Sequence, residues 1–262
     1  MSSAAQSLPI DISNLCKAYG SIKALDDVSL NIAAGEFLTL LGPSGSGKTT
    51  LLMALAGFVR PDGGSIRFGD QEMIVTPPHK RGLGMVFQSY ALFPFMTVAE
   101  NVAYGLKVHG VPGKERDARV DAMLEMMHID MLADRRIDQL SGGQRQLIAL
   151  AAALFGRPRM LLLDEPTTAL DDHGVGPSIG LIDIVRRAGI TTFIVSHERE
   201  ILVRADAILA LANGQIQVVP VRAKADQMIA PPPAPVASPV APPARDGQMR
   251  ITPKRIAVPN PD

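Results

Sequence analysis

Residues 42–49 combine the residue types that a polyphosphate-binding loop needs. They follow the spacing G-x-x-x-x-G-K-T, with Lys48 and Thr49 in the last two positions. Glycines let several backbone N–H groups approach one anion, the lysine can reach the β- and γ-phosphates, and the threonine hydroxyl can bind Mg²⁺. We therefore predict nucleotide contacts from Gly42, Pro43, Ser44, Gly45, Ser46, Gly47, Lys48, Thr49 and Thr50.

The segments on either side of this loop support that chemistry. Residues 36–41 form an apolar run that predicts a buried strand, and residues 50–56 predict a helix that Gly57 ends. A phosphate in the loop then lies at the positive end of the helix dipole. A glycine-rich turn without a ligand is the alternative, which the strand–loop–helix context disfavours.

Two carboxylates follow the apolar run Met160–Leu163, which is typical of a strand buried on both faces of a parallel sheet. Ligands of α/β proteins gather at the carboxyl ends of such strands. We therefore expect Asp164 to hold Mg²⁺ and Glu165 to orient or deprotonate an attacking water. A surface acidic pair that caps the strand is the alternative.

A histidine follows a further apolar run at residues 191–195. A lone histidine is usually structural. Because His197 comes at the end of a predicted core strand, like the carboxylates, we expect it to contact the γ-phosphate.

Residues 90–145 predict a helical insertion between two core strands. Thr97 and Glu100 have capping-box spacing, and apolar residues in 114–127 recur on one helix face. Four methionines gather there: Met123, Met126, Met127 and Met131. We expect them to pack in the core rather than to form an adaptable docking surface. Ser141 has cap-like spacing before a predicted helix over 145–155. At the start of that helix, Gly142 and Gly143 could form a second anion site, although this short motif alone is weak evidence for one.

The remaining short segments complete an α/β fold. Apolar patterning predicts strands at 10–15, 28–32, 65–68 and 85–87, and a hairpin at 208–219 that turns at Asn213-Gly214. Ten of the 21 prolines lie in 231–262. We therefore expect an N-terminal tail at 1–9, one folded domain at 10–220 and a proline-rich, disordered tail at 221–262, inert rather than an interaction segment.

Composition narrows the function classes. Lys plus Arg and Asp plus Glu are both 26, which argues against binding nucleic acid through bulk positive charge. Cys16 is the single cysteine, so no internal disulfide framework is expected. No apolar run is long enough to span a membrane, and residues 1–9 lack the pattern of a secretion signal.

These features, in this order, resemble the ATP-binding subunit of an ABC transporter. The resemblance covers about residues 10–219 and rests on 42–49, Gln88, the family signature Leu-Ser-Gly-Gly-Gln at 140–144, the run 160–165 with Ala169–Asp171, and His197. It implies a P-loop NTPase core with a mostly parallel sheet, an N-terminal antiparallel β subdomain and a helical insertion subdomain.

The resemblance also implies roles. Two copies would meet head to tail, with each ATP between the phosphate loop of one copy and Ser141, Gly142, Gly143 and Gln144 of the other. Tyr19 would stack on adenine, unless it is an ordinary buried tyrosine. Gln88 would reach Mg²⁺ and the water, Glu165 would be the catalytic base, His197 the switch histidine, and Asp171 would communicate across the dimer.

Residues 81–94 and 97–102 resemble importers of polyamines, ferric iron, sulfate or related solutes. The implied partners are separate integral membrane permease subunits, docked in a groove beside Gln88, and indirectly a solute-binding protein; the implied location is the cytoplasmic face of the inner membrane. Many relatives carry a further C-terminal β-domain, for which the proline-rich segment is unsuited. A non-transport ABC ATPase and an ATP-binding regulatory protein remain as alternatives.

Overall fold

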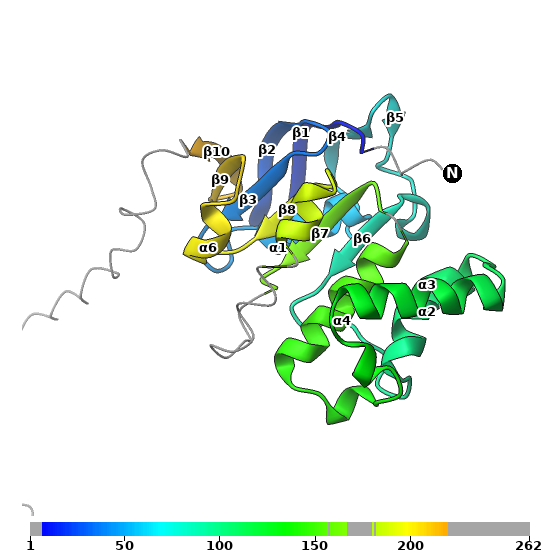
Figure 1. The fold of residues 1–262 in the computed structure, drawn as a ribbon. Coiled ribbons are helices and arrows are strands. Elements are labelled where there is room, and N and C mark those ends of the chain that lie inside the picture. Colours follow the sequence, from blue (N-terminus) through cyan, green and yellow to red (C-terminus); the bar gives the residue numbers. More distant parts are fainter. Residues whose placement is uncertain (1–6, 157, 167–179, 181, 220–262) are drawn as a thin grey trace, which may run out of the picture. The chain divides into compact units, whose positions relative to one another are not determined.

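A computed structural model describes residues 7–156, 158–166, 180 and 182–219 of the 262. Within them the strands form two sheets (Figure 1). The larger sheet contains, in spatial order, β10 (Gln215–Val219), β9 (Ala207–Ala212), β3 (Phe37–Leu41), β8 (Thr191–Val195), β7 (Met160–Asp164) and β6 (Leu83–Val86). The smaller sheet contains β2 (Ile22–Ile32), β1 (Ile10–Tyr19), β4 (Gly63–Phe68) and β5 (Gln71–Glu72).

The predicted mostly parallel core is confirmed. The strands β9, β3, β8, β7 and β6 are parallel to their neighbours, and only β10 pairs antiparallel, through the hairpin at Asn213-Gly214. Both turn residues have positive φ, which the Asn-Gly sequence tolerates. The smaller sheet is antiparallel throughout, as expected.

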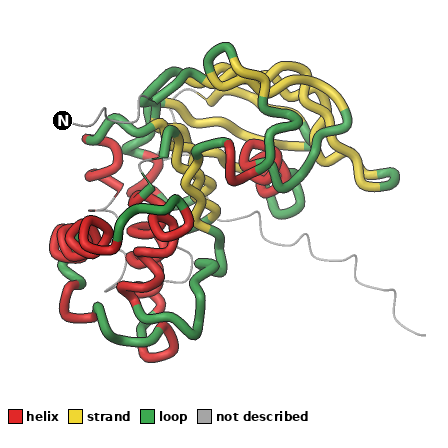
Figure 2. Tube along the Cα trace, turned by 90° about the vertical axis from the view of Figure 1, so that its right-hand side faces the viewer, coloured by secondary structure: helices red, strands yellow, loops and turns green. Residues whose placement is uncertain are grey.

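Helices connect and cover the sheets. The helix α1 (Lys48–Ala56) follows β3, and α2 (Val98–Val108), α3 (Gly113–Met126) and α4 (Gly142–Phe155) separate β6 from β7 along the chain. Figure 1 and Figure 2 show α2, α3 and α4 gathered in one group, and α4 packs against both α2 and β6. Short 3₁₀ turns lie at Pro78–Lys80, Asp130–Leu132 and Ile137–Gln139, residues 182–187 are helical, and α6 spans Arg199–Leu202.

The apolar run in β7 is buried on both faces, as predicted. Its odd and even side chains belong to different core clusters: Leu161 and Leu163 pack with the α4 side, whereas Met160 and Leu162 pack with α1 and the antiparallel sheet. This alternation explains why the segment is apolar at every position, and it fixes where the following carboxylates emerge.

The N-terminal strands are longer than the sequence predicts. Strand β1 continues to Tyr19 and β2 begins at Ile22, because the register between them shifts after Ile12, Leu15 and Lys17. Each bulge resets which side chains face the core, so apolar alternation is lost while pairing continues.

The methionine cluster divides. Met127 is buried and Met123 packs against the core, but Met126 and Met131 are 48% and 70% exposed. Core packing is therefore the wrong expectation for the latter pair, because Met126 at the end of α3 and Met131 in the following 3₁₀ turn point to solvent.

No helix among the described residues is long and apolar enough to cross a membrane. The proline-rich segment 221–262 and the N-terminal residues 1–6 lie outside the described residues. The domain boundaries at 9 and 220 remain predictions.

A buried arginine joins α1 to the segment that leads into β6. The guanidinium of Arg81, 2% exposed, donates hydrogen bonds to the carbonyl oxygens of Ala54 and Leu55 in the last turn of α1, and to that of Thr76. A cation at the carboxyl end of a helix satisfies carbonyls that have no helical partner and opposes the helix dipole. Burial lowers the pKa of Arg81 from its ordinary value.

Substituting Arg81→Met should lower the free energy of unfolding by about 3 kcal/mol, because it leaves buried carbonyls without donors. Arg81→Lys, which keeps one donor group, should lose less. Urea unfolding of both variants measures the effect. A loss below about 0.5 kcal/mol for Arg81→Met would show that this contact does not hold α1 in place.

Candidate nucleotide site

The parallel strands bring the predicted chemical groups to one edge of the larger sheet. The loop 42–49 follows β3, Gln88 follows β6, Asp164 and Glu165 end β7, and His197 follows β8. These four strands are neighbours and run in the same direction, so their carboxyl ends lie together.

A pocket of about 670 Å³ lies at this edge. It is lined by predicted site residues together with two that the sequence did not indicate, Ile22 and Ala24. The predicted ones are Tyr19, Gly42, Ser44, Gly45, Gly47, Lys48, Thr49, Thr50, Gln88, Asp164, Glu165 and His197. Pro43 and Ser46 belong to the same loop but do not line the pocket, and Ser46 is buried. No pattern in β2 could have identified Ile22 and Ala24, because their place depends on the pairing with β1.

The protein's own backbone explains two of the loop glycines. A Cβ atom on Gly42 would lie 2.2 Å from the carbonyl oxygen of Leu211, and one on Gly47 would lie 2.1 Å from that of Ala24. Both have positive φ. At Gly45 an added Cβ would meet nothing within 4 Å, so contacts do not require a glycine there. Its positive φ of 76°, which residues with a side chain rarely adopt, does favour one.

The lysine of the loop is folded onto the loop itself. The Lys48 ammonium donates to the carbonyl oxygens of Gly42 and Pro43, at 2.8 and 2.9 Å. These neutral acceptors hold the charge beside the pocket. Because a phosphate oxygen is a stronger, charged acceptor, the ammonium can exchange these bonds for contacts to an anion.

Asp164 and Thr49 lie side by side and fit a magnesium ion. Asp164 is 8% exposed, and burial raises the pKa of its carboxyl, while a hydrogen bond from Thr49 and the charge of Lys48 oppose that rise. A buried carboxylate beside a hydroxyl at the mouth of a phosphate loop is a donor set suited to Mg²⁺. The described residues contain no group of three or more His, Cys, Asp or Glu that could hold a metal ion.

Glu165 is held in an uncommon backbone conformation. Its φ is 49°, and its N–H donates to the carbonyl oxygen of Val195 in the neighbouring strand at 3.0 Å. Non-glycine residues in this region carry a conformational cost and are enriched at functional sites. The side-chain amide of Gln88 donates to the Glu165 carboxylate at 3.3 Å, so the structure brings these two predicted residues into contact.

The alternative for Tyr19 is wrong: the side chain is 50% exposed rather than buried, and it lines the pocket. His197 also lines the pocket and is exposed, so its place at the site follows from the end of β8 rather than from core packing.

The signature residues lie elsewhere. Ser141 is the N-cap of α4, and its side chain accepts from the Gln144 N–H at 3.3 Å, while the Gln144 side chain accepts from the Ser141 N–H at 3.0 Å. None of Ser141, Gly142, Gly143 and Gln144 lines the pocket described above. Asp171 lies outside the described residues.

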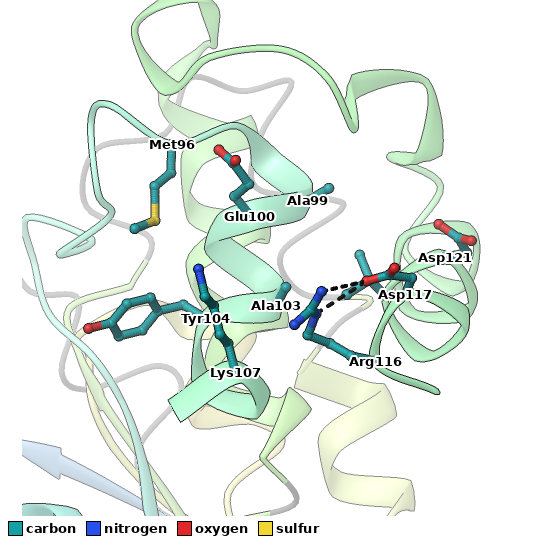
Figure 3. Close-up of a pocket in the computed structure, with 10 residues that line it drawn as sticks. Met96, Ala99, Glu100, Ala103, Tyr104, Lys107, Arg116, Asp117 and Asp121 are labelled. Atoms are coloured by element: carbon teal, nitrogen blue, oxygen red, sulfur yellow. Dashed lines mark hydrogen bonds and ion pairs between the residues drawn. The ribbon is translucent and has the colours of Figure 1, made fainter. Parts of the chain in front are cut away.

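A second pocket, of about 400 Å³, lies between α2 and α3. Figure 3 shows residues that line it, among them Glu100, Tyr104 and Lys107 of α2, with Arg116 of α3 paired to Asp117. The Tyr104 ring packs on Phe93, 4.4 Å between centroids, and Phe93 belongs to the segment that follows Gln88. This pocket is therefore linked through an aromatic contact to the segment that begins at the nucleotide site.

The family profile described as "ABC transporter" matches residues 25–168, more than half of the chain. The chain belongs to the ABC transporter family. The chain is 48% identical over 210 residues to the spermidine/putrescine import ATP-binding protein PotA of Marinobacter nauticus, an alignment that covers 79% of this chain and 56% of that protein. It is 45% identical over 205 residues to the putrescine transport ATP-binding protein PotG of Escherichia coli, covering 78% and 54%. The chain thus spans a little over half the length of these relatives.

Solved structures agree with the fold. The dimeric, post-hydrolysis structure of the ATP-binding cassette MJ0796 bound to ADP and Pi matches with a TM-score of 0.74 and 31% identity, covering 81% of this chain and 99% of that one. A nucleotide-free cassette from another ABC transporter matches with a TM-score of 0.71 and 28% identity, covering 80% and 89%. The P-loop NTPase fold class is confirmed.

Substituting Asp164→Asn should separate two effects of the buried carboxylate, its destabilisation of the folded protein and its binding of Mg²⁺. A raised pKa means that the folded protein loses stability as the pH rises from the unfolded carboxyl's value through the folded one. At pH 7 the nucleotide-free variant should therefore melt at a higher temperature than wild type. The rise in melting temperature that ATP causes in the variant should be the same in the presence of Mg²⁺ as in the presence of EDTA.

Thermal unfolding with ATP, under both conditions, measures these two effects. Asp70→Asn, at an exposed turn of the antiparallel sheet, is the control and should keep the Mg²⁺-dependent shift. If Asp164→Asn keeps the full shift, Asp164 does not serve the metal.

Proposed function

We propose that this protein is the ATP-binding and ATP-hydrolysing subunit of a solute importer. The observation that carries the proposal is one pocket that collects a phosphate loop, a carboxylate–hydroxyl pair suited to Mg²⁺, a second carboxylate in contact with a glutamine, and a histidine. One relative is named as a spermidine/putrescine import ATP-binding protein, and another as a putrescine transport ATP-binding protein.

The loop and α1 bind and orient the triphosphate. Backbone N–H groups of the loop and the amino end of α1 attract the phosphates, and Lys48 moves from its carbonyl acceptors to the β- and γ-phosphate oxygens. Thr49 and Asp164 would hold Mg²⁺, which would supply charge neutralisation at the phosphates, and Gln88 would be a further ligand that also orients the water.

Glu165 takes the proton from the attacking water. Its position is set by the backbone hydrogen bond to Val195 and by the contact with Gln88. His197, which follows β8, contacts the γ-phosphate, so its position depends on whether that phosphate is bound. The Gln88–Glu165 contact gives the site a way to transmit its state, because Gln88 lies at the start of the segment that leads to α2.

Two copies complete each site. The N-terminus of α4, with Ser141 as its cap, offers backbone donors and a positive dipole end, yet it does not line its own chain's pocket. Its partner is therefore the γ-phosphate held by a second copy, in a head-to-tail homodimer with ATP between the copies. The dimeric state of the solved MJ0796 cassette supports this arrangement.

The pocket between α2 and α3 receives a short helix of the permease subunit. It has apolar walls from Met96, Ala99, Ala103 and Val120 and charged groups at its rim, as a groove for an amphipathic helix needs. The Phe93–Tyr104 contact links it to the segment that begins at Gln88. Integral membrane permeases, with a solute-binding protein acting through them, then hold this subunit at the cytoplasmic face of the inner membrane.

The transported solute is a polyamine or a similar small solute. Both relatives described above are named for putrescine or spermidine, and the ATPase itself holds no part of the solute pathway in this assignment. The names of these relatives favour a transporter over a non-transport ATPase or a regulatory protein.

Glu165→Gln should lower steady-state ATP turnover at least about 100-fold while changing the ATP dissociation constant less than about threefold, because the amide cannot accept the proton but still fills the same space. Phosphate release and equilibrium binding of a fluorescent ATP analogue measure the two quantities. Glu200→Gln, an exposed carboxylate on α6, is the control and should keep wild-type turnover. Wild-type turnover by Glu165→Gln would remove Glu165 as the base, and a wild-type protein that binds no ATP would end the proposal.

A further inference from the structure

A lysine covers one face of the tyrosine at the edge of the nucleotide pocket. The Lys17 ammonium lies 5.5 Å from the centroid of the Tyr19 ring, within the range of a cation–π contact. Its side chain is only 18% exposed, so most of the stem is packed against the protein. Tyr19 lines the pocket and Lys17 does not. The ammonium therefore approaches the ring from outside the pocket and leaves one face for a ligand.

An aspartate from a distant turn holds that lysine. Asp62, in the turn between α1 and β4, accepts from the Lys17 ammonium through Oδ1 at 2.8 Å. Its Oδ2 accepts the N–H of Ala18 at 2.8 Å, and its own N–H donates to the carbonyl oxygen of Cys16 at 2.8 Å. One residue thus fixes three consecutive positions immediately before Tyr19.

The sheet holds these positions from one side only, because Lys17, Ala18 and Tyr19 pair with β2 but not with β4. The last register pair between β1 and β4 is Cys16 with Gly63, and the register between β1 and β2 shifts on both sides of Lys17. Beyond Cys16, none of the described strands pairs with the edge of β1 that faced β4, and the Asp62 carboxylate accepts the Ala18 N–H there. Asp62 therefore holds β1 just before Tyr19, on the side where β4 no longer pairs with it.

We propose that Lys17 and Asp62 are positioning residues for the nucleotide base: they hold the Tyr19 ring with one face covered, so that a purine stacks on the other. The inference rests on the proposed function, since it requires ATP in the pocket. A ring already held in place loses less conformational freedom when a base stacks on it, which raises affinity for the nucleotide without changing the chemistry at Glu165.

The charge state suits this role. The hydrogen bond from Lys17, with that from the Ala18 N–H, holds the pKa of Asp62 below its ordinary value. The carboxylate is therefore ionised at neutral pH and keeps both contacts.

The test compares ligands with and without a base. Dissociation constants for Mg-ATP and for magnesium tripolyphosphate, with KM and kcat for ATP, are measured for wild type, Lys17→Met and Asp62→Asn. Both variants should raise the ATP dissociation constant and KM about fivefold, leave kcat within about twofold, and leave tripolyphosphate binding unchanged, because only ATP carries a base.

The tyrosine provides a second test by a double-mutant cycle. Tyr19→Ala should weaken ATP binding at least as much as Lys17→Met, and adding Lys17→Met to Tyr19→Ala should have no further effect, since the lysine acts through the ring.

Asp206→Asn is the matched control. Asp206 also accepts one side chain, from Arg186 at 2.9 Å, and one backbone N–H, from Phe37 at 3.0 Å, but it does not line the pocket. It should leave the affinity for both ligands unchanged.

Several outcomes would overturn the inference. They are unchanged ATP affinity in Lys17→Met and Asp62→Asn, equal weakening of ATP and tripolyphosphate, or an additive effect of Lys17→Met on Tyr19→Ala. A wild-type protein that binds both ligands while the variants do not differ from it contradicts only this inference. A wild-type protein that binds neither ligand contradicts the proposed function itself.

Discussion

The phosphate loop keeps its shape because the protein's backbone closes around it at two points. Carbonyl oxygens of Leu211 and Ala24 approach Gly42 and Gly47 so closely that a side chain has no room at either position. One carbonyl comes from β9, in the parallel sheet, and the other from β2, in the antiparallel sheet. The loop therefore depends on both sheets, which explains why a nucleotide pocket needs the N-terminal strands as well as the P-loop core.

The same edge of the sheet links catalysis to transmission. Because β6 and β7 are parallel neighbours, Gln88 and Glu165 meet although they lie far apart in the chain. Gln88 opens the segment that carries Phe93 to Tyr104 on α2, beside the pocket we assign to the permease. In the function we propose, these contacts carry a change at the γ-phosphate toward the permease, and Glu165 has a backbone conformation that is uncommon outside functional sites.

Local signals in the sequence predicted the loop, the capping boxes at Thr97 and Ser141, and the strand before Asp164, because each depends on residues close together in the chain. Long-range pairing could not be predicted. Two features depend on which strands become neighbours: the bulges within β1, and the contacts of Asp62 with the residues just before Tyr19. The signature at 140–144 had meaning only through the family resemblance, since one chain does not bring it to its own pocket.

The central claim is that ATP joins the loop of one copy to the signature of another. Light scattering of Glu165→Gln, with and without Mg-ATP, tests it most directly. We expect a monomer without nucleotide, a mass that doubles with Mg-ATP, and a nucleotide-bound monomer when Ser141→Arg is added, since a bulky cation there blocks the second copy. A Glu165→Gln protein that is saturated with ATP and remains monomeric would contradict the claim.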